Sequence, residues 1–302
     1  MTATIALPLR IGARTVWHFR RRLVRVGVAL EAGLSGSVPA LPALAPRSDG
    51  YLVAALPASG LHDLRVAHPH LRAFVRQHYP RSYASLAGSF DDYLAGFSAK
   101  SRSTLKRKLR KFTEASGGAL DLRSYSAPDE VDDFYHHARA VSASTYQERL
   151  LDAGLPSGDD ALVGMRERAR RGAMRGWILF LAGEPVSYLY APAEGATLIY
   201  AYLGYDPAHA GLSPGTVLQL EAMRALMEEG RFALFDFTEG DGQHKRQFGT
   251  GALDCVDLLL VRPTLANLAV GHALGVFDAC VALAKQAARA TGAERLARTL
   301  LR

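Results

Sequence analysis

Residues 177–249 read WILFLAGEPVSYLYAPAEGATLIYAYLGYDPAHAGLSPGTVLQLEAMRALMEEGRFALFDFTEGDGQHKRQFG, and this stretch decides the fold. Three short segments rich in strand-forming residues lie at 177–181, 186–190 and 197–203. The turn signals Ala-Gly-Glu-Pro and Pro-Ala-Glu-Gly separate them. The stretch therefore predicts a hairpin followed by a third strand.

A helix follows the third predicted strand. Between 216 and 229 the apolar side chains are three and four residues apart, which indicates an amphipathic helix, and Gly230 ends it as a C′ glycine. Residues 232–237 predict one more buried strand, after which an acidic turn runs into a basic segment at 244–246.

The loop Ser213-Pro214-Gly215-Thr216 opens this helix. A helix start has free backbone N–H groups and the positive end of the helix dipole, so it suits an anion such as a phosphate. Small residues let the phosphate approach the backbone, and Pro214 fixes the approach. The alternative is that Ser213 is an ordinary N-cap and Pro214 the usual first-turn proline. The loop is neither a Walker loop nor a dinucleotide fingerprint, so those nucleotide sites have no support.

The runs YAYLGYDPAHAGLSPGTVLQLEAMRAL at 200–226 and GRFALFDFTEGDGQHKRQFG at 230–249 carry a resemblance. They resemble the central segment of GNAT-like acyltransferases of bacterial polysaccharide and lipid operons, relatives of the Fem-type peptidoglycan transferases. In that family a strand and a "gyD…sPG" loop lead into the cofactor-binding helix, and a "DFg.Gd..YK" segment follows the next strand. The resemblance extends upstream to about Phe90, through a basic helix and the segment VSASTYQ, and it fades before about Gly50 and after Pro263.

This resemblance implies an α+β fold with a GNAT-type mixed, mostly antiparallel sheet flanked by helices, and it allows a duplicated, two-lobed arrangement. It implies acyl-CoA or acetyl-CoA as co-substrate and no metal. It also implies that backbone N–H groups at the end of the 197–203 strand polarise the thioester carbonyl. The cofactor-binding residues it points to are Gly211, Ser213, Gly215 and Thr216.

The same resemblance places acceptor-binding residues around the sheet. Tyr146 matches the family's "vs..tyq" segment near the acceptor, with plain packing as its alternative role. Tyr202 and Lys245 are the other two candidates for contact with the substrate.

The charged turn after the last strand is where we expect the general base. Asp236 or Glu239, partly desolvated at a strand end, could have a raised pKa and accept a proton. His244 stands where the family usually has a tyrosine, and its ordinary pKa near 6.5 makes it the other candidate. The alternative is that both acids pair with Lys245 and Arg246 and merely pin the turn.

Composition describes a protein with a sizeable core and an anionic partner. Of 302 residues, 49% are hydrophobic and 22% charged, and the formal net charge is +7. Cys255 and Cys280 give no disulfide framework and no metal spacing, so we expect both to be buried and reduced, as in a cytosolic protein. We also expect no membrane-spanning stretch, and the basic N-terminus lacks a signal-peptide pattern.

The most basic segment, 98–112, predicts a helix with an apolar stripe at Leu105, Leu109 and Phe112 and cationic side chains on the other faces. It is either a solvated helix face or a patch for a phosphorylated or membrane-bound ligand. Aromatic residues that would stack on bases are absent from it, so no specific nucleic acid is expected. Residues 265–301 predict a helical tail that either packs on the core or lies on a membrane surface.

We expect three parts: an N-terminal lobe at 1–115 that includes the basic helix, an acyltransferase core at 116–263, and a helical tail at 264–302. The predicted function is transfer of an acyl group from a CoA thioester to an amine of a sugar- or lipid-type acceptor, such as a sphingoid base, by a cytoplasmic enzyme at the inner face of the membrane. Two alternatives stay open. One is a Fem-like transferase that uses aminoacyl-tRNA, and the other is a non-catalytic protein that binds an acyl or glycan ligand.

Overall fold

The computed structural model describes residues 2–11, 14–145, 154–240 and 242–290. The chain divides into two compact units, residues 1–80 with 253–302, and residues 81–252. The sequence had suggested boundaries near 115 and 263. A boundary at 115 would separate the basic helix α4 (Ala99–Ala115) from α8 (Pro214–Glu229), although the two helices pack together within the second unit.

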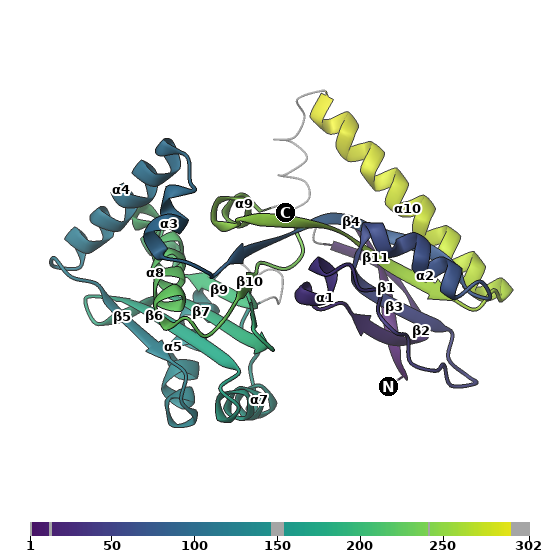
Figure 1. Ribbon diagram of the computed structural model, residues 1–302, viewed down its shortest axis with the longest axis horizontal. Helices are drawn as coiled ribbons and strands as arrows, with labels where there is room; N and C mark the ends of the chain where they lie inside the picture. Colours follow the sequence, from purple (N-terminus) through teal and green to yellow (C-terminus); the bar gives the residue numbers. More distant parts are fainter. Residues whose placement is uncertain (1, 12–13, 146–153, 241, 291–302) are drawn as a thin grey trace. The chain divides into compact units, whose positions relative to one another are not determined.

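The unit at 81–252 is built on a mixed, mostly antiparallel sheet flanked by helices, as predicted (Figure 1). Its strand order is β4-β10-β8-β7-β6-β5, and β9 also pairs with β7. Only the β10–β8 pair is parallel within this set. The bounds are β4 Arg72–Ser85, whose last residues belong to this unit, β5 Asp121–Tyr125, β6 Met174–Leu181, β7 Glu184–Glu194, β8 Thr197–Ile199, β9 Tyr202–Tyr205 and β10 Leu234–Asp236.

Helices cover both faces of this sheet, which explains why β6 reads as a continuous apolar run rather than an alternating one. On one face lie α3 (Phe90–Ala95), α4, α8 and α9 (Gln243–Phe248). On the other lie α5 (Val131–Ser144) and α7 (Asp159–Arg170). Ser89 caps α3, because its side chain accepts a hydrogen bond from the Asp92 N–H.

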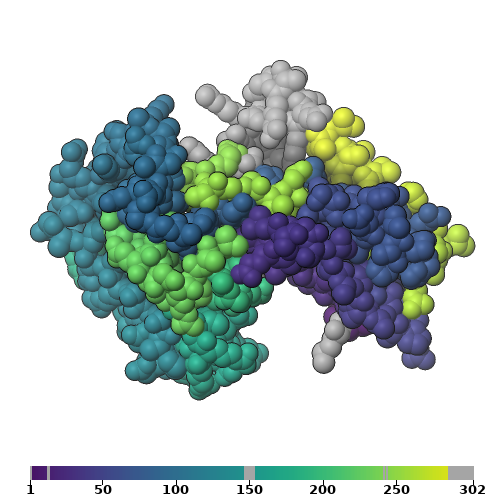
Figure 2. Space-filling model, viewed as in Figure 1, coloured from purple at the N-terminus to yellow at the C-terminus, as the bar shows by residue number. Residues whose placement is uncertain are grey.

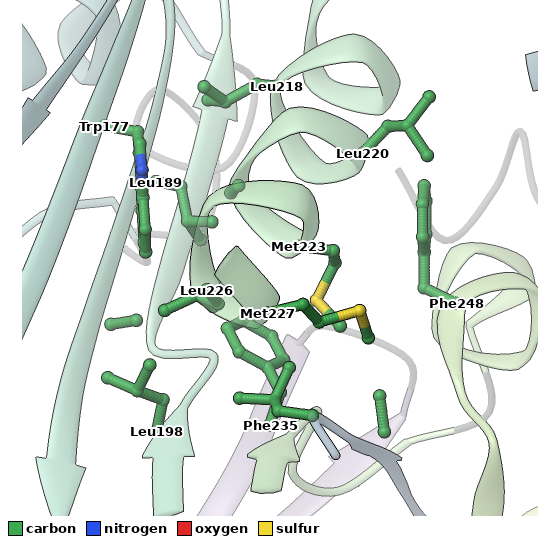
Figure 3. Close-up of a cluster of buried hydrophobic side chains, with 14 of the residues drawn as sticks. Trp177, Leu189, Leu198, Leu218, Leu220, Met223, Leu226, Met227, Phe235 and Phe248 are labelled. Carbon is green, nitrogen blue, oxygen red and sulfur yellow. The ribbon is translucent and has the colours of Figure 1, made fainter. Parts of the chain in front are cut away.

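Helix α8 contributes seven of the 24 buried residues of the larger core, more than any other element (Figure 3). Leu218 and Leu226 project from it toward Trp177 and Leu189, whereas Met223 lies beside Met227 on the side that faces Phe248. Its apolar spacing and its end at Gly230, which has a left-handed φ of 64°, confirm the sequence prediction.

The third predicted strand, 197–203, is two strands. β8 pairs with both β7 and β10, whereas β9 pairs with β7 and leaves the β10 side after a break at residues 200–201. The Tyr200 N–H donates to the Asp236 carbonyl, and this is the last backbone hydrogen bond to β10 before the chain turns away into β9. One backbone edge of β9 therefore carries no neighbouring strand within the described residues.

The other unit has strand order β1-β2-β3-β11-β4, with β2–β3 parallel. Apolar residues at 71, 75 and 78 are spaced too sparsely to define an element, and residues 72–85 form β4, which neighbours β11. The bounds are β1 Thr2–Ile11, β2 Arg14–Gly27, α1 Leu30–Leu34, β3 Gly50–Pro57, α2 Leu61–Ala67, β11 Gly251–Val261 and α10 Leu265–Ala290.

Helix α10 corrects two expectations. Its residues 265–284 are long and apolar enough to cross a membrane by length and composition, and 22% of that window is buried, whereas no such stretch was expected. Cys255 is buried as predicted, but Cys280 on α10 is exposed.

Candidate functional site

A cavity of about 250 Å³ opens where the start of α8, strand β9 and helix α9 meet, all within the 81–252 unit. Its wall is formed by one glycine together with aromatic, aliphatic and polar residues. The lining residues are Tyr200, Leu203, Tyr205, Gly215, Thr216, Gln219, His244 and Phe248. The open edge of β9 and the first turn of α8 thus border the same space.

The first turn of α8 has the geometry of an anion site. Ser213 occupies the N-cap position in the left-handed conformation (φ 56°, ψ 46°), and its side chain makes no capping hydrogen bond. Ser213 therefore does not act as an ordinary N-cap through its side chain. Gly215 follows in the first turn, and its missing Cβ leaves room against Leu203 and Tyr205. The Thr216 and Val217 N–H groups that come next donate to the Ser213 carbonyl at 3.0 and 3.2 Å.

Two lysines of α4 extend this anion site, and the sequence analysis did not single them out. The Lys108 Nζ donates to the Thr216 Oγ1 at 3.1 Å, and the Lys111 Nζ donates to the Gly211 carbonyl at 2.9 Å. Figures 1 and 2 show α4 beside α8, which brings these side chains to the loop. A signal was present, since Lys108 falls within the spacing of the apolar stripe at Leu105 and Leu109.

Electrostatics make the Lys108 position suited to an anion. Burial, and then the neighbouring positive charge of Arg107, lower the pKa of Lys108 below its ordinary value. The negative charge of a bound phosphate would favour the charged ammonium and so counteract both effects. Gly211 contributes a backbone carbonyl to Lys111 and does not line the cavity.

His244 is the titratable base that reaches the cavity. It stands on α9 with its ring 5.6 Å from the ring of Tyr200, centroid to centroid. Partial burial, and then the charge of Lys245, lower the pKa of His244 below 6.5. The imidazole is therefore neutral at pH 7 and able to accept a proton.

Asp236 is placed differently from what the sequence suggested. Its carboxylate is 1% exposed and holds Arg81 of β4 through several hydrogen bonds, the shortest 2.6 Å from Nη2. It also accepts the Thr238 N–H at 2.8 Å. It does not line the cavity, so its geometry favours holding β10 to β4 over acting as a base.

Glu239 and Lys245 order the turn between β10 and α9. The Lys245 Nζ donates to the backbone carbonyl of Glu239 and, at 3.4 Å, to the Thr238 Oγ1. The Glu239 residue is exposed and is not part of the cavity wall. Two interactions therefore hold the turn in place: the hydrogen bond from the Lys245 ammonium to the Glu239 carbonyl, and the ion pair between Arg81 and Asp236.

Of the two tyrosines considered for the acceptor, Tyr202 does not line this cavity. Tyr202 stacks on Tyr190, with ring centroids 6.4 Å apart, and packs on the α5 side of the sheet. Tyr146 lies outside the described residues. Within the described residues, no group of three or more His, Cys, Asp and Glu side chains is arranged to hold a metal ion.

Acyl transfer to an amine needs an anchor for the donor, polarisation of a carbonyl and a proton acceptor. The lysines and the α8 start supply positive charge, and His244 supplies a neutral base. Strand β9 supplies the backbone edge that has no neighbouring strand within the described part of the chain. All three border the same cavity or the loop that forms it.

Comparison with known proteins agrees with this geometry. Residues 99–246 match the family model described as the acetyltransferase (GNAT) domain. No curated protein matches the sequence.

Three solved structures share the fold at low sequence identity. The C-terminal domain (DUF2156) of an Agrobacterium fabrum protein is 14% identical, with a TM-score of 0.51 over 74% of this chain and 71% of that one. FemX is 10% identical, with a TM-score of 0.51 over 71% and 72%. L-PGS from Bacillus licheniformis is 14% identical, with a TM-score of 0.50 over 74% and 73%. The family match and the shared fold confirm the resemblance read from the sequence: the chain carries, across residues 99–246, an acetyltransferase domain of the GNAT family.

Proposed function

We propose that the protein transfers an acyl group from a CoA thioester to the amine of a sugar- or lipid-type acceptor. One observation carries the proposal: a single cavity is bordered by the α8 start with its lysines, by the open edge of β9 and by His244. Each of these features answers one requirement of the reaction.

The proposed roles follow from position. Lys108, Lys111 and the first turn of α8 hold the diphosphate of CoA. Backbone N–H groups of β9 donate to the thioester carbonyl oxygen, on which negative charge grows as the amine attacks. His244 takes the proton that the amine nitrogen loses as the C–N bond forms and the C–S bond breaks, and the departing thiolate is protonated in turn.

His244 is a better candidate than Glu239 for this base. Both residues are exposed, but His244 lines the cavity and Glu239 does not. Glu239 is then expected to tune the charge around Lys245, whose pKa it raises against the lowering effect of burial.

The donor site is tested by Lys108→Gln against Lys106→Gln. Both changes remove one charge from α4, but Lys106 is exposed and Lys108 contacts Thr216. Calorimetric titration with CoA should show about tenfold weaker binding for Lys108→Gln, the effect of one charge-assisted contact, and little change for Lys106→Gln. Equal affinities in both variants would remove the donor site from this loop.

The acceptor is found by product analysis. Purified protein incubated with mixed acyl-CoAs and a cell extract should yield a new N-acylated compound by mass spectrometry, and His244→Gln should not produce it. Free CoA release with no acylated amine would contradict transfer to an amine.

A second candidate donor, aminoacyl-tRNA, is favoured by one observation. The cationic residues of α4 extend outward from Lys108 to the exposed Lys106, Arg107 and Arg110, where RNA phosphates could bind. Retention of tRNA that falls steeply with salt, together with no CoA binding, would select this donor over CoA.

We also propose that the 1–80 and 253–302 unit contacts the anionic inner face of a membrane. A hollow between α2 and α10 is lined by Arg65, Arg72, His62 and His272 among apolar side chains. Along α10 an exposed apolar stripe runs beside it at spacings of three and four residues, formed by Ala269, Ala273, Val276, Cys280 and Leu283. Positive charge beside an exposed apolar helix face suits an anionic lipid surface.

A further inference from the structure

Gln219 is a buried amide with no partner for either of its polar atoms. It stands on α8, is 2% exposed, and lines the cavity described above. Within the described residues, neither its Oε1 nor its Nε2 makes a hydrogen bond. A buried donor and acceptor left unpaired destabilise the ligand-free protein, so such groups usually await something that pairs with them.

The nearby hydroxyl groups already have partners. The Thr216 Oγ1 accepts from Lys108, and the Ser187 Oγ donates to the Gly204 carbonyl at 2.8 Å. Replacing the carboxamide by an apolar side chain would also fit the surrounding core, where Leu218, Leu220 and Met223 are all buried. Packing alone gives no reason for an amide at this position.

The position of Gln219 on α8 determines which part of a bound ligand its carboxamide can contact. Gly215 and Gln219 are four residues apart, so they share a helix face and lie about 6 Å apart along the axis. A ligand whose anionic group sits at the helix start would present to Gln219 the atoms about one helical turn further into the cavity.

We infer that Gln219 is a specificity-determining residue, and that its carboxamide pairs with an amide-type group of the ligand, accepting from an N–H and donating to a C=O. The inference rests on the proposed function, because it takes the ligand to enter from the α8 start. A ligand with only hydrocarbon at this depth would leave both amide atoms unpaired and would be rejected. Two sources carry this chemistry: the amide-bearing arm of the CoA donor and an amide beside the acceptor's amine.

The test compares Gln219→Met with Leu220→Met, an apolar replacement at the next position on the same helix, 3% exposed and outside the cavity. Thermal midpoints are measured for the ligand-free proteins. Affinities are measured for CoA, for 3′-phosphoadenosine 5′-diphosphate, which has the phosphates but no amide, and for glycylglycinamide, an amine that carries amides. Gln219→Leu repeats the measurement with a second side chain.

We expect the ligand-free Gln219→Met protein to melt no lower than the wild type, while Leu220→Met melts lower. CoA binding weakened roughly ten- to hundredfold, with 3′-phosphoadenosine 5′-diphosphate binding unchanged, assigns Gln219 to the donor arm. Unchanged CoA binding with weakened glycylglycinamide binding assigns it to the acceptor.

Unchanged affinity for both amide-bearing probes overturns the inference. A wild-type protein that binds no CoA defeats the proposed donor instead. In that case the inference is tested by the affinity for glycylglycinamide and by the thermal midpoints. It is contradicted if Gln219→Met lowers the thermal midpoint as much as Leu220→Met does.

Discussion

Asp236 shows how a carboxylate in a charged turn can serve the fold rather than the chemistry. Its charge is neutralised by Arg81, which is 8% exposed, so both charges lie out of water and depend on each other. In a buried pair of this kind, removing one partner leaves the other charge uncompensated.

Asp236→Ala is therefore expected to destabilise the 81–252 unit by about 3–5 kcal/mol, and urea denaturation measures it. Glu239→Ala in the same turn is the control. Because that residue is exposed, its effect should stay within about 0.5 kcal/mol. Similar losses in the two variants would contradict the structural role given to Asp236.

The pH dependence of turnover tests His244. The base must be neutral to accept a proton, and burial and Lys245 hold the pKa of His244 below 6.5. The rate should therefore be constant through pH 7 and fall only as pH drops through a midpoint below 6.5, where the imidazole becomes charged.

His244→Gln should lower kcat by roughly 10²- to 10⁴-fold and abolish the acid limb, while CoA affinity stays near that of the wild type. His18→Gln, an exposed histidine on β2, serves as the control. An acid limb that persists in His244→Gln would assign the titration to another group.

Residues of this site differ in how visible they were from the sequence. His244, Gly215 and Thr216 were found because a loop motif and a turn marked them, and all three line the cavity. Gln219 lies in the middle of a helix, and Lys108 lies 108 positions from its hydroxyl partner. Pairing across such separations depends on helix packing, which local patterns do not encode.

At the scale of elements, the close approach of the α8 start to β9 shapes one wall of the cavity. A Cβ placed on Gly215 would lie 3.1 Å from Leu203 Cδ2 and 3.3 Å from Tyr205 Cδ1, both on or at the end of β9. The glycine thus lets the helix start approach the strand closely.

Gly215→Val should push these side chains into the cavity and weaken CoA binding by about tenfold or more, measured by titration. Gly164→Ala on α7 is the matched control, because its Cβ would meet nothing within 4 Å and a helical alanine is favoured. An unaltered CoA affinity in Gly215→Val would show that the donor binds elsewhere.

Most elements of the 81–252 unit could be predicted because their periodicity was long and clear, as in α8 and α4. The break at residues 200–201 could not, because β8 and β9 form one apolar run in the sequence and differ only in their partners: β8 pairs with β7 and β10, and β9 pairs with β7. Strand β4 depends on a distant partner, because β11 is about 180 residues away in the sequence.

For the whole molecule, the net charge of +7 and the stripe on α10 lead to one prediction about partners. The protein should sediment with vesicles that contain anionic phospholipid, and not with neutral vesicles, and the binding should weaken as salt rises.

Val276→Asp, which places a charge in the α10 stripe, should reduce vesicle binding several-fold. Val163→Asp on α7 alters a similarly exposed valine, 57% against 65%, and should have little effect. Equal binding by both variants would remove α10 from the contact.

The division into units was the least predictable feature of the chain. The segments 1–80 and 253–302 form one unit although 172 residues separate them. Strands β4 and β11 enter and leave the middle unit, and nothing in their composition marks the crossing. The family resemblance covered only the middle of the chain, so it could not supply this arrangement.

The exposed thiol of Cys280 allows α10 to be labelled specifically. Cys255 is fully enclosed, so a mild thiol reagent would modify the native protein at Cys280 alone, without any engineered residue. A polarity-sensitive dye attached there sits on the outward side of α10, and its emission colour would report directly whether that helix leaves water when liposomes are added.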